Sequence, residues 1–124
     1  MKTQSAKAKG RKLQQHVRDA IIEAFKEHGV EPDDVKSTAM GQGGADVQLS
    51  PFAKSFFPYS VECKSHKGMA IYGIYSQAEA NTDKDTEPLV VVKINNRKPL
   101  AVVDFDHYMM LVKEYHRKCR KDFE

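Results

Sequence analysis

The sequence contains few cysteines and no long apolar run, and each scarcity excludes a class of protein. The spacing between its two cysteines, Cys63 and Cys119, matches no metal-binding motif, so we expect reduced thiols in a cytoplasmic protein. The longest apolar runs are four or five residues, whereas a membrane-spanning helix needs about 20. The basic N-terminus is followed by Gln14, Gln15 and His16 instead of an apolar stretch, so no signal peptide is expected.

Two common kinds of ligand-binding motif are also missing. None of the five histidines forms a His-x-x-x-His pair and there is no Cys-x-x-Cys, so a zinc site is not expected. The glycine-rich loop at 40–44 lacks the Lys-Ser/Thr of a P-loop and the spaced glycines of a dinucleotide fold. This loop is either a turn between strands or a place where the backbone passes close to a phosphate or a metal.

Charge is nearly balanced overall but unevenly distributed along the chain. The 124 residues carry a formal net charge of +3, which permits a polyanionic partner without requiring one. Basic residues concentrate at 2–12 and 113–121, where they are either solvated surface or phosphate contacts. We expect residues 1–10 to form a flexible basic arm and residues 11–124 to form a single domain.

Apolar periodicity predicts an α/β (α+β) domain. Helices are predicted over 11–28, 70–81 and 107–120, with a short helical segment over 51–57. Strands are predicted over 35–39, 45–49, 59–64, 89–94 and 100–105. The last helix is expected to begin at an Asp106 cap and to turn four apolar side chains inward, those of Tyr108, Leu111, Val112 and Tyr115. The expected architecture is a mixed sheet flanked by helices, in the order α-β-β-β-α-β-β-α.

The predicted strand at 59–64 carries the candidate chemistry. Alternation puts Glu62 and Lys64 on one face and Cys63 on the other, and Asp46 lies in the strand before it. Two carboxylates and the backbone carbonyl of Cys63 suit Mg²⁺, which prefers oxygen ligands. Lys64 would orient or deprotonate a water, or stabilise transition-state charge. The alternative is an ion pair on a solvated face with no catalytic role.

One residue of the first predicted helix is a further candidate. Helical spacing places Gln14 at the edge of the apolar arc, between Ile21 and Phe25, with Gln15 on the other side. Gln14 is therefore expected to face the strands that carry Asp46 and Glu62.

The same residues make the chain resemble the PD-(D/E)XK nuclease superfamily, most of all archaeal Holliday junction resolvases and small phage-encoded nucleases. Those resolvases have a Lys-Gly pair, a helical glutamate, a strand ending in serine, a glycine loop, an aspartate, a Glu-x-Lys strand and a helical glutamine. The matching positions, within about 10–95, are Lys9, Gly10, Gln14, Ser37, the loop 41–44, Asp46, Glu62, Lys64 and Gln77. Gln14 departs from the pattern, because a resolvase has a glutamate there, and this favours one metal over two.

The resemblance implies a restriction-endonuclease-like fold and a DNA endonuclease that uses Mg²⁺, with Mn²⁺ as a substitute. It implies selectivity for branched DNA, a role in DNA recombination, a homodimer, and a bacterial, archaeal or phage-infected cell. The implied catalytic residues are Asp46, Glu62, Lys64 and Gln77, with Asp46, Glu62, the Cys63 carbonyl and Gln14 as candidate metal ligands. The candidate DNA contacts are Lys9, Arg11, Lys12, Ser37, Gln42, His66 and Lys67.

Three other functions are compatible with the same residues. The chain could be a nucleic-acid-binding module that kept the fold without activity, which the neutral Gln14 would fit. It could be a sequence-specific or homing-type endonuclease of the same superfamily. It could also be a structural or regulatory protein in which Glu62 and Lys64 form only an ion pair.

Overall fold

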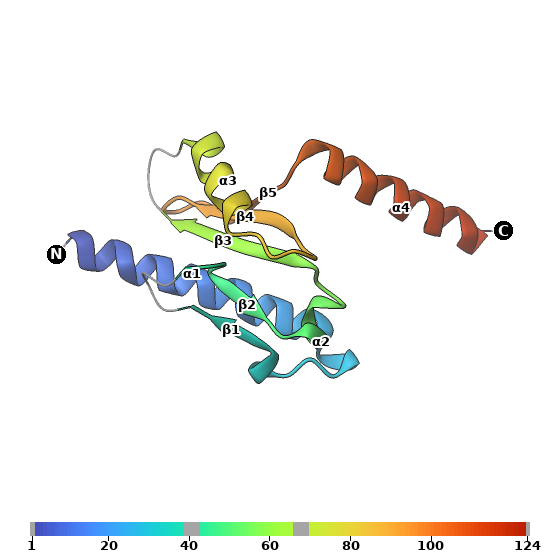
Figure 1. Cartoon of the computed structure of the whole chain (residues 1–124), viewed down its shortest axis with the longest axis horizontal. Helices are drawn as coiled ribbons and strands as arrows, with labels where there is room; N and C mark the ends of the chain where they lie inside the picture. The colour runs from blue at the N-terminus through green and yellow to red at the C-terminus, as the bar shows by residue number, and fades with distance from the viewer. Residues whose placement is uncertain (1, 39–42, 66–69, 124) are drawn as a thin grey trace.

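The computed structural model describes residues 2–38, 43–65 and 70–123, and its centre is a five-stranded mixed sheet (Figure 1). The strands are β1 (Val35–Ser37), β2 (Val47–Leu49), β3 (Tyr59–Ser65), β4 (Glu87–Lys93) and β5 (Leu100–Val102). They lie across the sheet in chain order, and neighbours are antiparallel except β3 and β4, which are parallel. The predicted class, a mixed sheet combined with helices, is confirmed.

Helices precede, interrupt and follow the strands. The α-helices are α1 (Lys2–Phe25), α2 (Pro51–Lys54), α3 (Ile71–Ala80) and α4 (Phe105–Phe123), and the 3₁₀ turns are η1 (Lys26–His28) and η2 (Pro32–Asp34). No described helix is both long enough and apolar enough to cross a membrane. The predicted short helix at 51–57 is present as α2, where Ser50 accepts a hydrogen bond from the Ala53 N–H.

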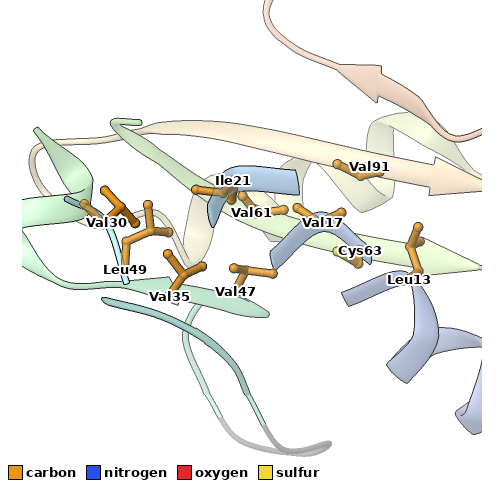
Figure 2. Close-up of a cluster of buried hydrophobic side chains, with 11 residues drawn as sticks. Leu13, Val17, Ile21, Val30, Val35, Val47, Leu49, Val61, Cys63 and Val91 are labelled. Carbon is orange, nitrogen blue, oxygen red and sulfur yellow. The ribbon is translucent and has the colours of Figure 1, made fainter. Parts of the chain in front are cut away.

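The sheet separates two apolar clusters, one on the α1 face and one on the α3 face. Figure 2 shows the larger cluster, which joins α1 to the strands through Leu13, Val17, Ile21, Val35, Val47, Val61, Cys63 and Val91. The smaller cluster joins α3 to β4 through Ile74, Ala78, Val90 and Val92. Because Val61 and Cys63 of β3 face α1, alternation turns Glu62 and Lys64 to the α3 face of the sheet.

α1 begins at Lys2, well before the predicted start at 11. Residues 2–10 therefore extend the helix in this structure instead of forming an irregular arm. The three lysines and two alanines of this segment are good helix formers, whereas Gly10 disfavours helix by about 1 kcal/mol relative to alanine. At its other end α1 passes into η1 and stops at Gly29, whose φ of 98° is left-handed, so the predicted glycine cap is confirmed.

α4 differs most from its prediction. Asp104, not Asp106, caps the helix: its Oδ2 accepts from the His107 N–H at 2.9 Å and its carbonyl accepts from the Tyr108 N–H at 3.0 Å. The side chains predicted to face inward are all exposed, namely Tyr108, Leu111, Val112 and Tyr115. The prediction was wrong because helical spacing defines an apolar face without defining what covers it, and α4 projects away from the sheet (Figure 1).

The β1–β2 hairpin is shorter than predicted, and its loop end holds Asp46. The two strands pair from Val35↔Leu49 to Ser37↔Val47 and no further. Beyond that point the backbone N–H of Thr38 donates to the Asp46 carbonyl at 2.8 Å, and the Thr38 hydroxyl donates to the same oxygen at 2.6 Å. Asp46 therefore lies just before β2, where the hairpin opens beside the central strand β3.

Candidate active site

Asp46 is attached to β3 by two hydrogen bonds. Its backbone N–H donates to the Val61 carbonyl at 2.9 Å, and its side-chain Oδ2 accepts from the Cys63 N–H at 2.8 Å. The second bond satisfies a strand N–H that lies beyond the single β2–β3 pair, Val47↔Val61. The carboxylate is thereby fixed against the strand that carries Glu62 and Lys64, as the sequence predicts.

Glu62 is a buried carboxylate with one unsatisfied oxygen. The residue is 5% exposed, and its Oε1 lies 3.7 Å from the Lys64 Nζ. Its Oε2 is buried and has no hydrogen-bond partner among the described residues. A buried acceptor without a partner costs about 1–3 kcal/mol and more when it is charged, so this oxygen is a position where a cation or a water would be favourable.

The Cys63 carbonyl lies on the same side of β3 as Asp46. The N–H and C=O of one strand residue point the same way within the sheet, and the Cys63 N–H donates to Asp46. The carbonyl of Cys63 therefore also faces the loop end of the hairpin. Asp46 and this carbonyl, two of the three oxygen donors predicted from the sequence, therefore lie on the same side of β3.

Burial sets the protonation behaviour of the two carboxylates. Desolvation raises the pKa of Asp46, against the Cys63 hydrogen bond and the Lys64 charge, which lower it. Desolvation and then the Asp46 charge raise the pKa of Glu62, against the opposing influence of Lys64. A bound cation would reverse both shifts by stabilising the charged forms.

Cys63 takes part through its backbone and not through its thiol. Burial, with the charges of Asp46 and Glu62, raises the pKa of the thiol to about 12. The thiol is therefore protonated near neutral pH, and protonated thiols are poor nucleophiles. Its side chain packs in the larger core cluster (Figure 2).

Of two other predicted site residues, Gln14 lies on the opposite face of the sheet from Glu62, and Gln77 is exposed on α3. Gln14 is 5% exposed, and its Oε1 accepts from the Ser37 hydroxyl at 2.7 Å on the α1 face of the sheet. Glu62 and Lys64 turn to the opposite face, so the structure pairs Gln14 with Ser37 instead. Gln77 is exposed on α3, and among the described residues no hydrogen bond involves its side chain.

The predicted DNA contacts divide into described and undescribed residues. Lys9, Arg11 and Lys12 are exposed along the first half of α1. Ser37 is half-buried and is engaged with Gln14. Gln42, His66 and Lys67 lie outside the described residues, so the structure gives no account of these predicted contacts.

A basic hollow of ≈ 340 Å³ lies between α1 and the ends of β3 and β4. Its cationic rim comes from Lys9, Lys12 and Lys93, and the residues lining the rest are Leu13, His16, Ser65, Asn95 and Pro99. Within the described parts of the chain none of the three lysines forms a salt bridge. Unpaired lysines around a hollow attract an anion.

Sequence reasoning missed Lys93, His16 and Asn95 as members of this hollow. Ser65 pairs with Lys93 in the parallel β3–β4 ladder, so Lys93 ends β4 beside the strand that carries the site. Its alternation with Val92, which is on the α3 face, puts Lys93 on the α1 face. The parallel register was the missing information, because periodicity alone does not give it.

The described residues contain no group of three or more His, Cys, Asp or Glu side chains that could hold a metal ion. The candidate site has two such side chains, Asp46 and Glu62, and depends on a backbone carbonyl for a third oxygen. Comparison of the chain with protein-family models, with curated proteins and with solved structures finds no match. The superfamily resemblance thus rests on the motif residues alone.

Proposed function

We propose that this protein is a Mg²⁺-dependent DNA endonuclease of restriction-endonuclease-like fold that acts on branched DNA in the cytoplasm. The observation that carries the proposal is the unsatisfied Oε2 of Glu62 beside Asp46 and Lys64. A glutamate with only a structural role would be expected to satisfy both oxygens, because almost all buried polar atoms in proteins do so.

The donor set fits Mg²⁺ in number and in chemistry. Asp46, Glu62 and the Cys63 carbonyl offer hard oxygens, and Mg²⁺ is usually held by one or two carboxylates together with waters and substrate phosphate. When bound, the ion would supply a hydroxide near neutral pH and charge stabilisation for the phosphoryl oxygens. Mn²⁺ fits the same donors.

The protein residues would position the reacting groups. Asp46 is fixed by the Cys63 N–H, so one carboxylate needs no reorganisation before the reaction. Lys64 is partly exposed, with its Nζ 3.7 Å from Glu62, and could orient a water or stabilise negative charge on the phosphate. The lysines of the basic hollow would bind backbone phosphates on the α1 side of the same sheet edge.

A nucleic-acid-binding module without activity is the second candidate. The observation that favours it is Gln14, which replaces the resolvase glutamate and is engaged with Ser37 instead of with the carboxylates. In that case the basic hollow would still bind DNA, and the carboxylate pair would bind a cation weakly or not at all.

Cleavage assays on matched substrates test the proposal. Linear, nicked, forked and four-way DNA are incubated with Mg²⁺, Mn²⁺ or EDTA and with wild type, Asp46→Asn, Glu62→Gln or Lys64→Ala. The control variants are Glu79→Gln and Lys36→Ala, which change exposed residues of α3 and β1. We expect metal-dependent cleavage by wild type and both controls, strongest on branched DNA, and no cleavage by the three site variants.

Two results would count against the nuclease. Equal cleavage by wild type and the site variants would show that another residue set, or a contaminant, cuts the DNA. DNA binding in EDTA without cleavage under any metal condition would favour the inactive binding module. Gel-shift measurements on the same substrates separate these outcomes.

A further inference from the structure

Seven of the eleven large apolar side chains exposed among the described residues lie on α4, where five of them form one apolar face. Its side chains are between 41% and 72% exposed, namely Phe105, Tyr108, Leu111, Val112 and Tyr115. Such a face is unfavourable in water, and contiguous apolar patches of this kind mark interaction sites. The question is which partner covers it.

The sequence of the face has the spacing of a helix-pairing seam. Phe105, Tyr108, Val112, Tyr115 and Cys119 follow one another at alternating intervals of three and four residues. This is the heptad pattern, in which apolar positions recur every 3.5 residues on average and pack between two helices. Met109 and Leu111, which are 48% and 41% exposed, flank this row on either side and widen the apolar face.

The base of α4 is held so that this seam points away from the sheet of its own chain. Val103 and Asp104 alone separate β5 from α4, and Asp104 caps the helix. The Tyr59 hydroxyl and His107 Nε2 are hydrogen-bonded at 2.8 Å, which ties the first turn of α4 to β3. The helix then extends beyond the sheet (Figure 1), so the seam is available to another chain.

Charge along α4 favours an antiparallel partner of the same sequence. Asp104 and Asp106 lie at its N-terminal end, and Lys113, Arg117 and Lys118 lie in its second half. An antiparallel pair brings the acidic end of each helix beside the basic half of the other and opposes the helix dipoles. A parallel pair would place the basic halves together.

We propose that α4 is the self-association helix of this protein and pairs with α4 of a second copy in antiparallel orientation, with Val112 near the two-fold axis. A large aromatic side chain buries about 150–250 Å², so at the observed exposure the seam offers on the order of 500 Å² per copy. If the whole face is covered, two copies bury on the order of 1,000 Å², which is at the lower limit for a specific interface and is typical of weak association. The proposal does not depend on nuclease activity.

Sedimentation velocity of the full chain over about 1–200 µM tests the association. We expect a concentration-dependent change from monomer to dimer in wild type. Val112→Glu places two like charges against each other at the axis and should raise the dissociation constant at least about tenfold. Met110→Glu is the control, because Met110 is 51% exposed and lies on the opposite side of the helix from Val112; it should dimerise as wild type does. Both positions are exposed in the single copy, so neither variant should unfold, and circular dichroism verifies this.

Cysteine cross-linking tests the orientation. In a Cys119→Ser background, Val112→Cys should form a covalent dimer under a mild thiol oxidant, and Met110→Cys should not. Efficient oxidation of wild type through Cys119 would indicate a parallel pair and overturn the antiparallel arrangement. Three results would overturn the proposal itself. The first is a monomer at every concentration, and the second is an equal effect of Val112→Glu and Met110→Glu on the dissociation constant. The third is a monomer that sediments with anionic vesicles.

Discussion

Replacing Glu62 by glutamine distinguishes a metal ligand from a structural ion pair, because the two roles predict opposite changes in stability. The substitution keeps the shape of the side chain and removes its charge. In the metal-free protein Glu62 is buried beside Asp46, with one oxygen unsatisfied. If Glu62 binds a cation, its charge should destabilise the metal-free fold, and Glu62→Gln should then raise stability. If Glu62 serves only to pair with Lys64, Glu62→Gln should lower stability.

The pKa of Glu62 gives the sign of this effect with pH. Its ordinary value is 4.5, and burial and then Asp46 raise it in the folded protein. Between the ordinary and the folded pKa, the folded state holds a proton that the unfolded state has lost. The contribution of Glu62 to stability therefore falls as pH rises through that window, and the loss is complete above the folded pKa. At pH 8 in EDTA, Glu62→Gln should be more stable than wild type by about 1 kcal/mol, or about 4 °C in melting temperature.

Mg²⁺ should reverse the order of the two proteins. At about ten times its dissociation constant, a ligand that binds only the folded state adds about 1.4 kcal/mol, or about 5 °C for a chain of this size. Wild type should gain this stability, and Glu62→Gln should gain little. The melting temperatures of both proteins in EDTA and in Mg²⁺ show whether their order reverses. Glu79→Gln, at an exposed position on α3, is the control.

One pattern would refute the reasoning. If Glu62→Gln melts below wild type in EDTA at pH 8 and Mg²⁺ changes neither protein, Glu62 is a partner of Lys64 and not a ligand. A control that responds as Glu62→Gln does would show that the effect is general surface electrostatics.

Three further predictions follow from other parts of the structure. Gln14→Glu should destabilise the protein by about 1–3 kcal/mol, because it buries a charge on the α1 face, and should leave the Mg²⁺ requirement unchanged. Gln15→Glu, at an exposed position, should change neither stability nor the Mg²⁺ requirement; chemical denaturation and metal titration check this. Lys93→Ala should weaken DNA binding in EDTA on every sequence and lower the slope of log affinity against log salt concentration by about 0.9. Lys26→Ala should have neither effect, because Lys26 is paired with Glu23. Fluorescence anisotropy at several salt concentrations is the measurement. Gly29→Ala should cost about 1 kcal/mol, because its φ of 98° is strained for a residue with a Cβ, although the new Cβ would make only an ordinary contact with Phe52 at 3.6 Å. Gly10→Ala, with no neighbour within 4 Å, should stabilise α1 by about as much. Unfolding in urea should give these opposite signs, and equal signs would contradict the backbone argument.

The sequence predicted the central strand and the faces of its side chains because both depend on local information. Alternation requires only that 59–64 is a strand, and it then puts Glu62 and Lys64 on one face. The neighbouring position of Asp46 follows from the hairpin that connects consecutive strands. These parts of the candidate site needed no knowledge of the rest of the fold.

The parts that were missed depend on which face each element packs against. Gln14 was placed correctly near the apolar arc of its helix, but only the packing of α1 on the face of Val61 and Cys63 separates it from Glu62. Lys93 joins the basic hollow through the β3–β4 register, and an apolar strand pattern does not specify its neighbour. The apolar face of α4 was recognised, but its cover was assumed to be the chain's own sheet.

The distance between Lys64 and Glu62 supports a site held ready for a ligand over a completed ion pair. The other four salt bridges of the described residues lie at the surface and have N–O distances of 2.8 to 3.0 Å. The Lys64–Glu62 pair is the one with a buried carboxylate, yet its atoms are 3.7 Å apart. Desolvation penalises a buried ion pair unless its geometry is close and its remaining atoms are satisfied, so a purely structural pair should be the shortest of the five. A long pair with an unsatisfied oxygen instead suits a ligand, because it leaves lone pairs of the buried Glu62 carboxylate available.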